Sequence, residues 1–91
     1  MFTVIAYDIP DDKRRNKLVK LLKNYGKRVQ FSVFEAMLDN NQVQKMIQRA
    51  KQLIDPKQDS VRVYRICAEC EKNLTILGLG ERYIMEPFII A

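Results

Sequence analysis

The chain has 91 residues, 47% of them hydrophobic, which is enough for one domain with a modest core. It carries a net charge of +5 and no histidine, and the missing histidine excludes the usual general base, His-containing catalytic triads and most zinc catalysis. No apolar run is long enough to cross a bilayer and no signal-peptide pattern opens the chain, so we expect a cytoplasmic protein without a membrane partner.

The first predicted element is a buried strand that ends in a carboxylate. Residues 1–7 are mostly apolar, β-branched or aromatic, and Pro10 must end the strand because proline cannot donate to a sheet. Asp8 is therefore an acid at the C-terminal edge of a core strand, where it needs a cation, a metal or hydrogen-bond donors. The pattern leaves two interpretations open: a helix or turn cap, or part of a metal or phosphate-chemistry site.

An amphipathic helix is predicted over residues 11–25, with Asp11 or Asp12 as its N-cap and Gly26 as its C-terminal stop. Residues 13–28 contain eight Lys or Arg and no acid, and this one-sided charge suggests a polyanion such as nucleic acid. The alternative is a solvated helix face that aids solubility. The outer face of the helix is expected to carry Lys13, Lys17 and Lys20.

The next segment, residues 28–34, alternates with a period of two, which predicts extended strand. The pattern fits one long strand or two short strands that meet near Ser32, and no Gly or Pro decides between them. If the segment is extended, Arg28, Ser32 and Phe34 share a face. The apolar face is then expected to be formed by Val29, Phe31 and Val33.

The second half of the chain is predicted to form a helix over residues 43–54 and a strand over residues 60–67. A polar connection is expected over residues 68–73, followed by a β-prone apolar stretch at 74–77. The last segment, 81–91, is too apolar to remain in water, so we expect it to dock on its own sheet or on another subunit.

The resulting order is β-α-β(β)-α-β with an added C-terminal strand over about residues 78–91. It predicts a single α+β domain over residues 1–91, a ferredoxin-like β-α-β-β-α-β sandwich. Two helices cover only one face of an antiparallel sheet, so we expect a homodimer in which the bare faces stack.

Cys67 and Cys70 form a C-x-x-C pair. A thioredoxin-type motif would open a helix near the start of a βαβ unit, whereas this pair ends a late strand. The pair could supply two of the four ligands of a zinc site, so a metal would need both copies in a dimer. We interpret the two cysteines instead as partly buried, unreactive residues.

The remaining chemistry is that of a carboxylate among cations. Arg14 and Arg15 fall in the first turn of the predicted helix, close to where Asp8 leaves the sheet. Carboxylate oxygen suits Mg²⁺, and cations suit phosphates. One acid per chain is few for a metal site, but a dimer axis could bring two copies of Asp8 together. A metal-activated water could then attack a phosphodiester without a histidine.

Three motifs resemble those of a known family, and together they extend over essentially the whole chain. Residues 7–12 (YDIPDD), 26–35 (GKRVQFSVFE) and 55–64 (DP…DSVRVY) look like the motifs of CRISPR-associated protein two, a small CRISPR adaptation nuclease. The resemblance implies a ferredoxin-like homodimer that binds Mg²⁺, with Mn²⁺ as an alternative, through one Asp8 from each protomer. It also implies a C-terminal strand that crosses to the partner subunit.

The same resemblance implies an activity and partners. Family members are described as metal-dependent endonucleases on single-stranded RNA or duplex DNA, and they bridge two dimers of the CRISPR integrase during spacer acquisition. Asp8 matches the metal ligand, and other matched positions are linked to activity: Arg15, Lys17, Arg28 and Phe34, with Ser32 beside them. Lys17 stands where an arginine is often found, and a lysine keeps the charge but loses the bidentate fork.

Three functional hypotheses follow. The first is a Mg²⁺-dependent endonuclease. The second is a non-catalytic scaffold dimer that binds duplex backbone and bridges integrase dimers. The third is a generic ferredoxin-like RNA-binding module that reads bases with aromatic rings on its open sheet, for which Phe2 and Phe34 are the candidates.

Overall fold

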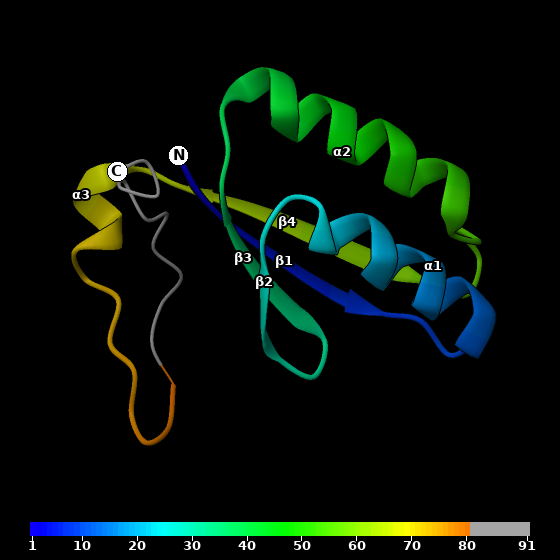
Figure 1. Cartoon of the computed structure of the whole chain (residues 1–91), viewed down its shortest axis with the longest axis horizontal. Coiled ribbons are helices and arrows are strands. Elements are labelled where there is room, and N and C mark those ends of the chain that lie inside the picture. The colour runs from blue at the N-terminus through cyan, green and yellow to red at the C-terminus, as the bar shows by residue number, and fades with distance from the viewer. Residues whose placement is uncertain (81–91) are drawn as a thin grey trace.

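The computed structural model describes residues 1–80. Up to residue 66 the chain follows the predicted order of strands and helices (Figure 1). The elements are β1 (Phe2–Asp8), α1 (Asp12–Lys23), β2 (Lys27–Gln30), β3 (Val33–Met37), α2 (Asn40–Leu53), β4 (Ser60–Ile66) and α3 (Ala68–Glu71). The segment around Ser32 therefore forms two short strands joined by a turn, which decides the alternative that the sequence left open.

The four strands form one antiparallel sheet in the order β2-β3-β1-β4, with β1 in its interior. Ile5 on β1 pairs with Phe34 on β3 and with Val63 on β4, so these three side chains lie on one face. Helices α1 and α2 lie side by side on this face (Figure 1). The sheet is thus covered by these helices on one side only.

The core lies between this face and the two helices. Apolar residues recur on α1 and α2 at helical spacing, and the stripe they form is buried against the sheet. Ile5, Phe34 and Ala36 are almost completely buried in this layer. The helices contribute Leu18, Val19, Leu21, Leu22, Val43, Met46 and Ala50.

Helix α1 begins and ends through local hydrogen bonds. The Asp11 carboxylate accepts a hydrogen bond from the Arg14 N–H at 2.9 Å, which makes Asp11 the N-cap. The helix ends at Lys23, two residues earlier than predicted, because the Asn24 and Tyr25 N–H groups bond to carbonyls only three residues back.

Gly26 has a different role from the one we expected. Its φ is not in the left-handed region, so it is not the C-cap glycine of α1. A Cβ atom at this position would lie 2.7 Å from the Ala36 Cβ and would also clash with the Glu35 carbonyl. Gly26 is therefore required because the start of β2 approaches the β3 backbone closely.

The apolar face predicted for residues 28–34 is wrong, because a turn separates β2 from β3. Phe31 is 78% exposed, whereas Phe34 is completely buried. The turn reverses the chain after Gln30, and a register shift between Arg28 and Gln30 breaks the alternation on β2. A period of two is therefore not maintained across this segment.

The structure also differs from the prediction after β4. Residues 68–71 form the short helix α3 rather than a polar connection, and residues 74–77 form no strand. The predicted C-terminal strand lies mostly outside the described residues. No helix in residues 1–80 has the length and apolar character needed to cross a membrane.

Candidate functional site

A surface cleft lies where the end of β1, the loop into α1 and the β2–β3 turn meet. Asp8, Arg15 and Ser32, three of the predicted site residues, line it together. The remaining lining residues are Tyr7, Ile9, Pro10 and Phe31. The fold therefore brings together an acid, a guanidinium and a hydroxyl from three separate segments.

Asp8 is the last residue of β1, and its side chain is exposed. The Asp8 carboxylate makes no hydrogen bond or ion pair with any other side chain or backbone group of residues 1–80. The cap of α1 is Asp11, so the interpretation of Asp8 as a helix cap is wrong. The Asp8 carboxylate is left to bind a group from outside the described part of the chain.

Arg15 is held against the loop that follows Asp8. Its guanidinium donates to the Ile9 carbonyl at 2.9 Å and to the Pro10 carbonyl at 3.4 Å, and it forms an ion pair with Asp12. The Arg15 side chain remains 27% exposed. These contacts fix a positive charge at the cleft without neutralising Asp8.

Tyr7 attaches the β2–β3 turn to β1. Its N–H donates to the Ser32 carbonyl at 3.1 Å, and its hydroxyl donates to the Phe31 carbonyl at 3.2 Å. Tyr7 belongs to the first motif, but the sequence alone predicted no role for it. The signal that could have identified it is its place on the buried face of β1, where a tyrosine hydroxyl needs a partner.

Arg28 lies beside the cleft rather than in its lining. Its guanidinium donates to the Tyr7 hydroxyl at 3.2 Å, and its central carbon lies 5.9 Å from the Phe31 ring centre and 5.8 Å from the Phe34 ring centre. Arg28 and Phe34 pair directly across β2 and β3, so they share a face as expected. The two aromatic contacts orient the guanidinium at the hairpin end.

Phe34 and Phe2 are both buried, with 0% and 1% of their surface exposed. Neither ring can stack on a base from this position, so the two rings named for the RNA-binding hypothesis do not form an aromatic platform. Phe34 instead packs in the core beneath the cleft, where its ring centre lies 6.4 Å from that of Tyr7.

Lys17 is exposed on α1 and does not line the cleft. Two residues along a helix correspond to a rotation of about 200°, so Lys17 and Arg15 lie on different faces. Exposed lysines continue along the helix: the expected Lys13, Lys17 and Lys20, followed by Lys23. This row of lysines is called the basic face below.

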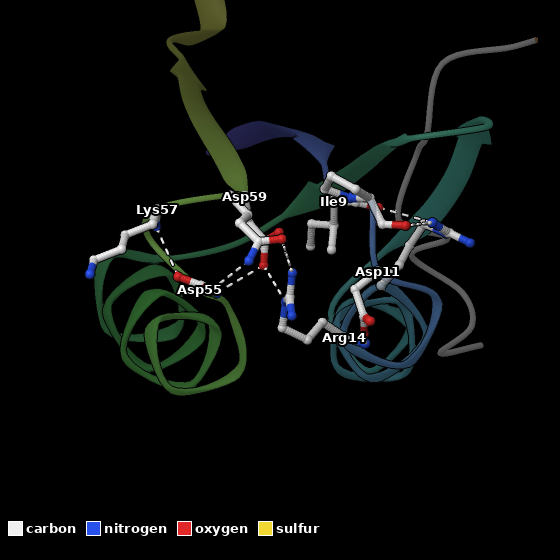
Figure 2. A network of polar contacts seen from close by, with 9 residues as sticks. Ile9, Asp11, Arg14, Asp55, Lys57 and Asp59 are labelled. Atoms are coloured by element: carbon white, nitrogen blue, oxygen red, sulfur yellow. Dashed lines mark hydrogen bonds and ion pairs between the residues drawn. The ribbon is translucent and has the colours of Figure 1, made fainter.

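A second polar network, missed by the sequence analysis, joins α1 to the loop before β4 (Figure 2). Arg14 donates to both carboxylate oxygens of Asp59, at 2.7 and 3.1 Å. Asp59 also accepts from the Asp55 N–H at 2.8 Å, and its side chain is fully buried. The available signal was the pair of acids in the third motif, Asp55 and Asp59, which lie in the loop directly before β4.

The network shifts the pKa of both partners. The hydrogen bonds from Arg14, helped by the Asp55 N–H, lower the pKa of the Asp59 carboxyl despite the opposing effect of burial. The same hydrogen bonding to Asp59 raises the pKa of Arg14. Both groups are therefore charged at neutral pH, and they anchor the N-terminal turn of α1 next to Arg15.

The donors at the cleft suit a hard cation, because Asp8 offers carboxylate oxygens without a competing partner in residues 1–80. No group of three or more His, Cys, Asp or Glu side chains comes together within that range. One chain thus supplies a single carboxylate at this cleft. Cys67 and Cys70 are both exposed, so the interpretation of them as partly buried is wrong.

The chain is similar to known proteins over most of its length. The family model described as CRISPR associated protein Cas2 matches residues 1–74. CRISPR-associated endoribonuclease Cas2 3 of Chloroflexus aurantiacus is 49% identical over 80 residues, which cover 88% of this chain and 86% of that protein.

Two solved structures share the fold. The crystal structure of Streptococcus pyogenes Cas2 at pH 6.5 matches with a TM-score of 0.75 and 32% identity, covering 86% of this chain and 100% of that chain. A chain in a partial Cas6-RT-Cas1–Cas2 complex matches with a TM-score of 0.72 and 29% identity, covering 84% of this chain and 83% of that one. The family model, the relative and the structures agree, and the chain belongs to the CRISPR-associated protein Cas2 family.

Proposed function

We propose that this protein is a Mg²⁺-dependent endonuclease that cleaves single-stranded RNA or duplex DNA and acts with the CRISPR integrase in spacer acquisition. The observation that carries the proposal is the Asp8 carboxylate, exposed in a cleft beside Arg15 and without a partner in residues 1–80. Membership of a family with a relative named as an endoribonuclease supports the same reaction class.

The active form in this proposal is a ferredoxin-like homodimer. The element order and the strand order β2-β3-β1-β4 support the ferredoxin-like assignment. On the sheet face opposite α1 and α2, Tyr64 is 48% exposed, and Val4 and Ala6 are only partly buried. A second copy stacked on this face would bury these residues, and its Asp8 would provide the second carboxylate.

Asp8 from each chain would hold the metal. When bound, Mg²⁺ lowers the pKa of a coordinated water and offsets phosphate charge. Arg15, fixed by the Ile9 and Pro10 carbonyls, would donate to phosphate oxygens and position the scissile group. Ser32 would donate from the opposite wall of the cleft. No histidine is present to remove a proton, so in this proposal the proton passes to the substrate phosphate or to solvent.

The basic face of α1 would bind the nucleic-acid backbone outside the cleft. Its lysines are exposed, and a row of like charges with no acid between Lys13 and Arg28 is suited to a polyanion. This division separates binding, by the basic face, from cleavage, by Asp8 and Arg15. Lys17 belongs to the binding part.

The test is the substitution Asp8→Asn in the full chain, with cleavage of labelled RNA and duplex DNA measured in Mg²⁺ and in Mn²⁺. We expect cleavage to fall at least about 10²-fold while affinity for duplex changes little, because a metal ligand is lost and no cation is removed. Titration of Mn²⁺ followed by its EPR signal should show loss of the bound ion. Glu69→Gln, an exposed carboxylate change on α3, is the matched control and should leave cleavage and Mn²⁺ binding unchanged.

The scaffold function is the second candidate, favoured by the similarity to a chain of a Cas1–Cas2 complex. The scaffold function is favoured over the endonuclease function if the purified wild-type protein cleaves neither RNA nor DNA in either metal but still binds the integrase and duplex. Cleavage that persists undiminished in the Asp8→Asn variant would contradict the role of Asp8.

A further inference from the structure

Cys67 and Cys70 form an exposed pair at the start of α3. Cys67 is the residue immediately before the helix and Cys70 is the third residue within it. A thioredoxin-type motif was not expected here, because such a motif opens a helix near the start of a βαβ unit and this pair ends a late strand. The structure shows that the pair does open a helix, α3, although this helix follows β4, the last strand of the described residues.

The spacing fits a disulfide. Residues three positions apart in the first turn of a helix lie on the same face, with Cα atoms roughly 5 Å apart. A disulfide requires Cα atoms about 4.4–6.8 Å apart. The Glu71 N–H donates to the Cys67 carbonyl at 2.9 Å, so the turn that carries both cysteines is closed by a backbone hydrogen bond.

The two thiols are not equivalent. The nearby backbone N–H of Cys70, and after it the Cys70 thiol, lower the pKa of Cys67. The adjacent Cys67 sulfur in turn raises the pKa of Cys70. A lowered pKa on the first cysteine and a raised pKa on the second distinguish a nucleophilic thiol from a resolving one.

The neighbouring charges do not block such chemistry. Glu69, between the two cysteines, forms an ion pair with Lys72 at 3.1 Å, so its negative charge is partly compensated. No third metal-ligating side chain joins the pair within residues 1–80. A soft metal ion would thus find two thiolates and no further ligand there, whereas disulfide chemistry needs only the two cysteines.

We propose that Cys67 and Cys70 form a redox-active dithiol that reduces small-molecule disulfides and is itself oxidised to an intrachain disulfide. The Cys67 thiolate attacks one sulfur of the disulfide, forms a mixed disulfide and releases one thiolate. Cys70 then loses its proton to solvent and attacks the Cys67 sulfur, which releases the second thiolate. Two protein thiols are oxidised and one small-molecule disulfide is reduced to two thiols.

The test uses the full chain, reduced and then incubated with oxidised glutathione. After acid quenching, free thiols are alkylated and the peptide carrying both cysteines is analysed by mass spectrometry. We expect wild type to lose two hydrogens, to retain no glutathione and to resist alkylation at both cysteines. Before oxidation, Cys67 should alkylate faster than Cys70, by about threefold for each unit of difference in pKa.

Single serine variants separate the two roles. Cys70→Ser should accumulate a mixed disulfide between glutathione and Cys67, because no resolving thiol remains. Cys67→Ser should react more slowly, and only at Cys70. Both side chains are exposed, so neither change should alter the unfolding midpoint appreciably, and circular dichroism checks this.

Three results would overturn the proposal. They are glutathione retained on wild type without an internal disulfide, disulfides formed only between chains, and equal alkylation rates at the two cysteines. The outcome is independent of nuclease activity, because neither cysteine lies in the Asp8 cleft.

Discussion

Arg14 on α1 and Asp59, the residue before β4, are joined by two hydrogen bonds of 2.7 and 3.1 Å although they lie 45 positions apart. Asp59 is buried and receives a further hydrogen bond from the Asp55 N–H. The pair therefore locks the N-terminal turn of α1 to the loop between α2 and β4 (Figure 2). Since Arg15 follows Arg14 directly, the same contact sets where the cleft guanidinium lies.

We expect Asp59→Asn to lower Tm by several degrees at neutral pH, because a buried charged hydrogen-bond pair is broken. The pKa of Asp59 is lowered in the folded state below its ordinary value of 3.8. Its contribution to stability is thus present above that value and is lost as the pH falls through the folded pKa. The Tm difference between wild type and variant should shrink below about pH 4, and thermal unfolding across a pH series measures it.

Asp12→Asn is the control for this experiment. Asp12 pairs with Arg15, but its side chain is 82% exposed, so the change should affect Tm little. A Tm difference for Asp59→Asn that stays constant down to strongly acidic pH would contradict the assignment of the pH dependence to this carboxyl.

Gly26→Ala should destabilise the protein by about 1–3 kcal/mol through overpacking. The added Cβ would lie 2.7 Å from the Ala36 Cβ and against the Glu35 carbonyl, so β2 must move away from β3. Urea unfolding monitored by circular dichroism gives the free energy of unfolding. Asn24→Ala, at an exposed position two residues earlier, should change it by under about 0.5 kcal/mol, and equal effects of the two variants would argue against the close approach as the cause.

Tyr7→Phe should weaken the attachment of the β2–β3 turn by about 0.5–1.5 kcal/mol, because the hydrogen bond to the Phe31 carbonyl is lost. Arg28 loses its contact with the hydroxyl at the same time. Amide hydrogen exchange should speed up over residues 27–33 more than over α2. Tyr25→Phe, at a partly buried position packed against the same core, is the comparison, and exchange that rises uniformly in both variants would show a global rather than a local effect.

Lys17→Ala tests the basic face within the proposed function. Loss of one phosphate contact should reduce the slope of log K against log[salt] for duplex binding by about 0.9, with cleavage at saturating substrate little changed. Lys72→Ala removes a lysine that is paired with Glu69 at the other end of the chain and should leave the slope unchanged. A slope that falls equally in both variants would mean that binding depends on total charge rather than on this helix face.

The sequence alone was sufficient to predict the elements as far as β4 and their order, but not the short helix α3. Leu18 and Leu22 belong to the apolar stripe of α1, and Met46 belongs to that of α2. These stripes specify which helix faces are buried, because a helical period of 3.6 places such residues on one side of the helix. Pro10 marks the end of β1 and so places Asp8 at the sheet edge. Such features depend on residues that are close in the sequence, within one or two helical turns, so a local sequence pattern is sufficient to predict them.

Only the tertiary structure decided which aromatic ring is buried and how the cleft is assembled. The alternation over residues 28–34 favoured Phe31 as apolar core, yet Phe31 is exposed and Phe34 is buried, because the turn and the register shift reverse the pattern. The pairing of Arg14 with Asp59 and the attachment of Ser32 to Tyr7 join segments that are distant in the chain. A local pattern carries no information about which distant partner satisfies a charge or a hydrogen bond, and packing of the helices on the sheet makes that choice.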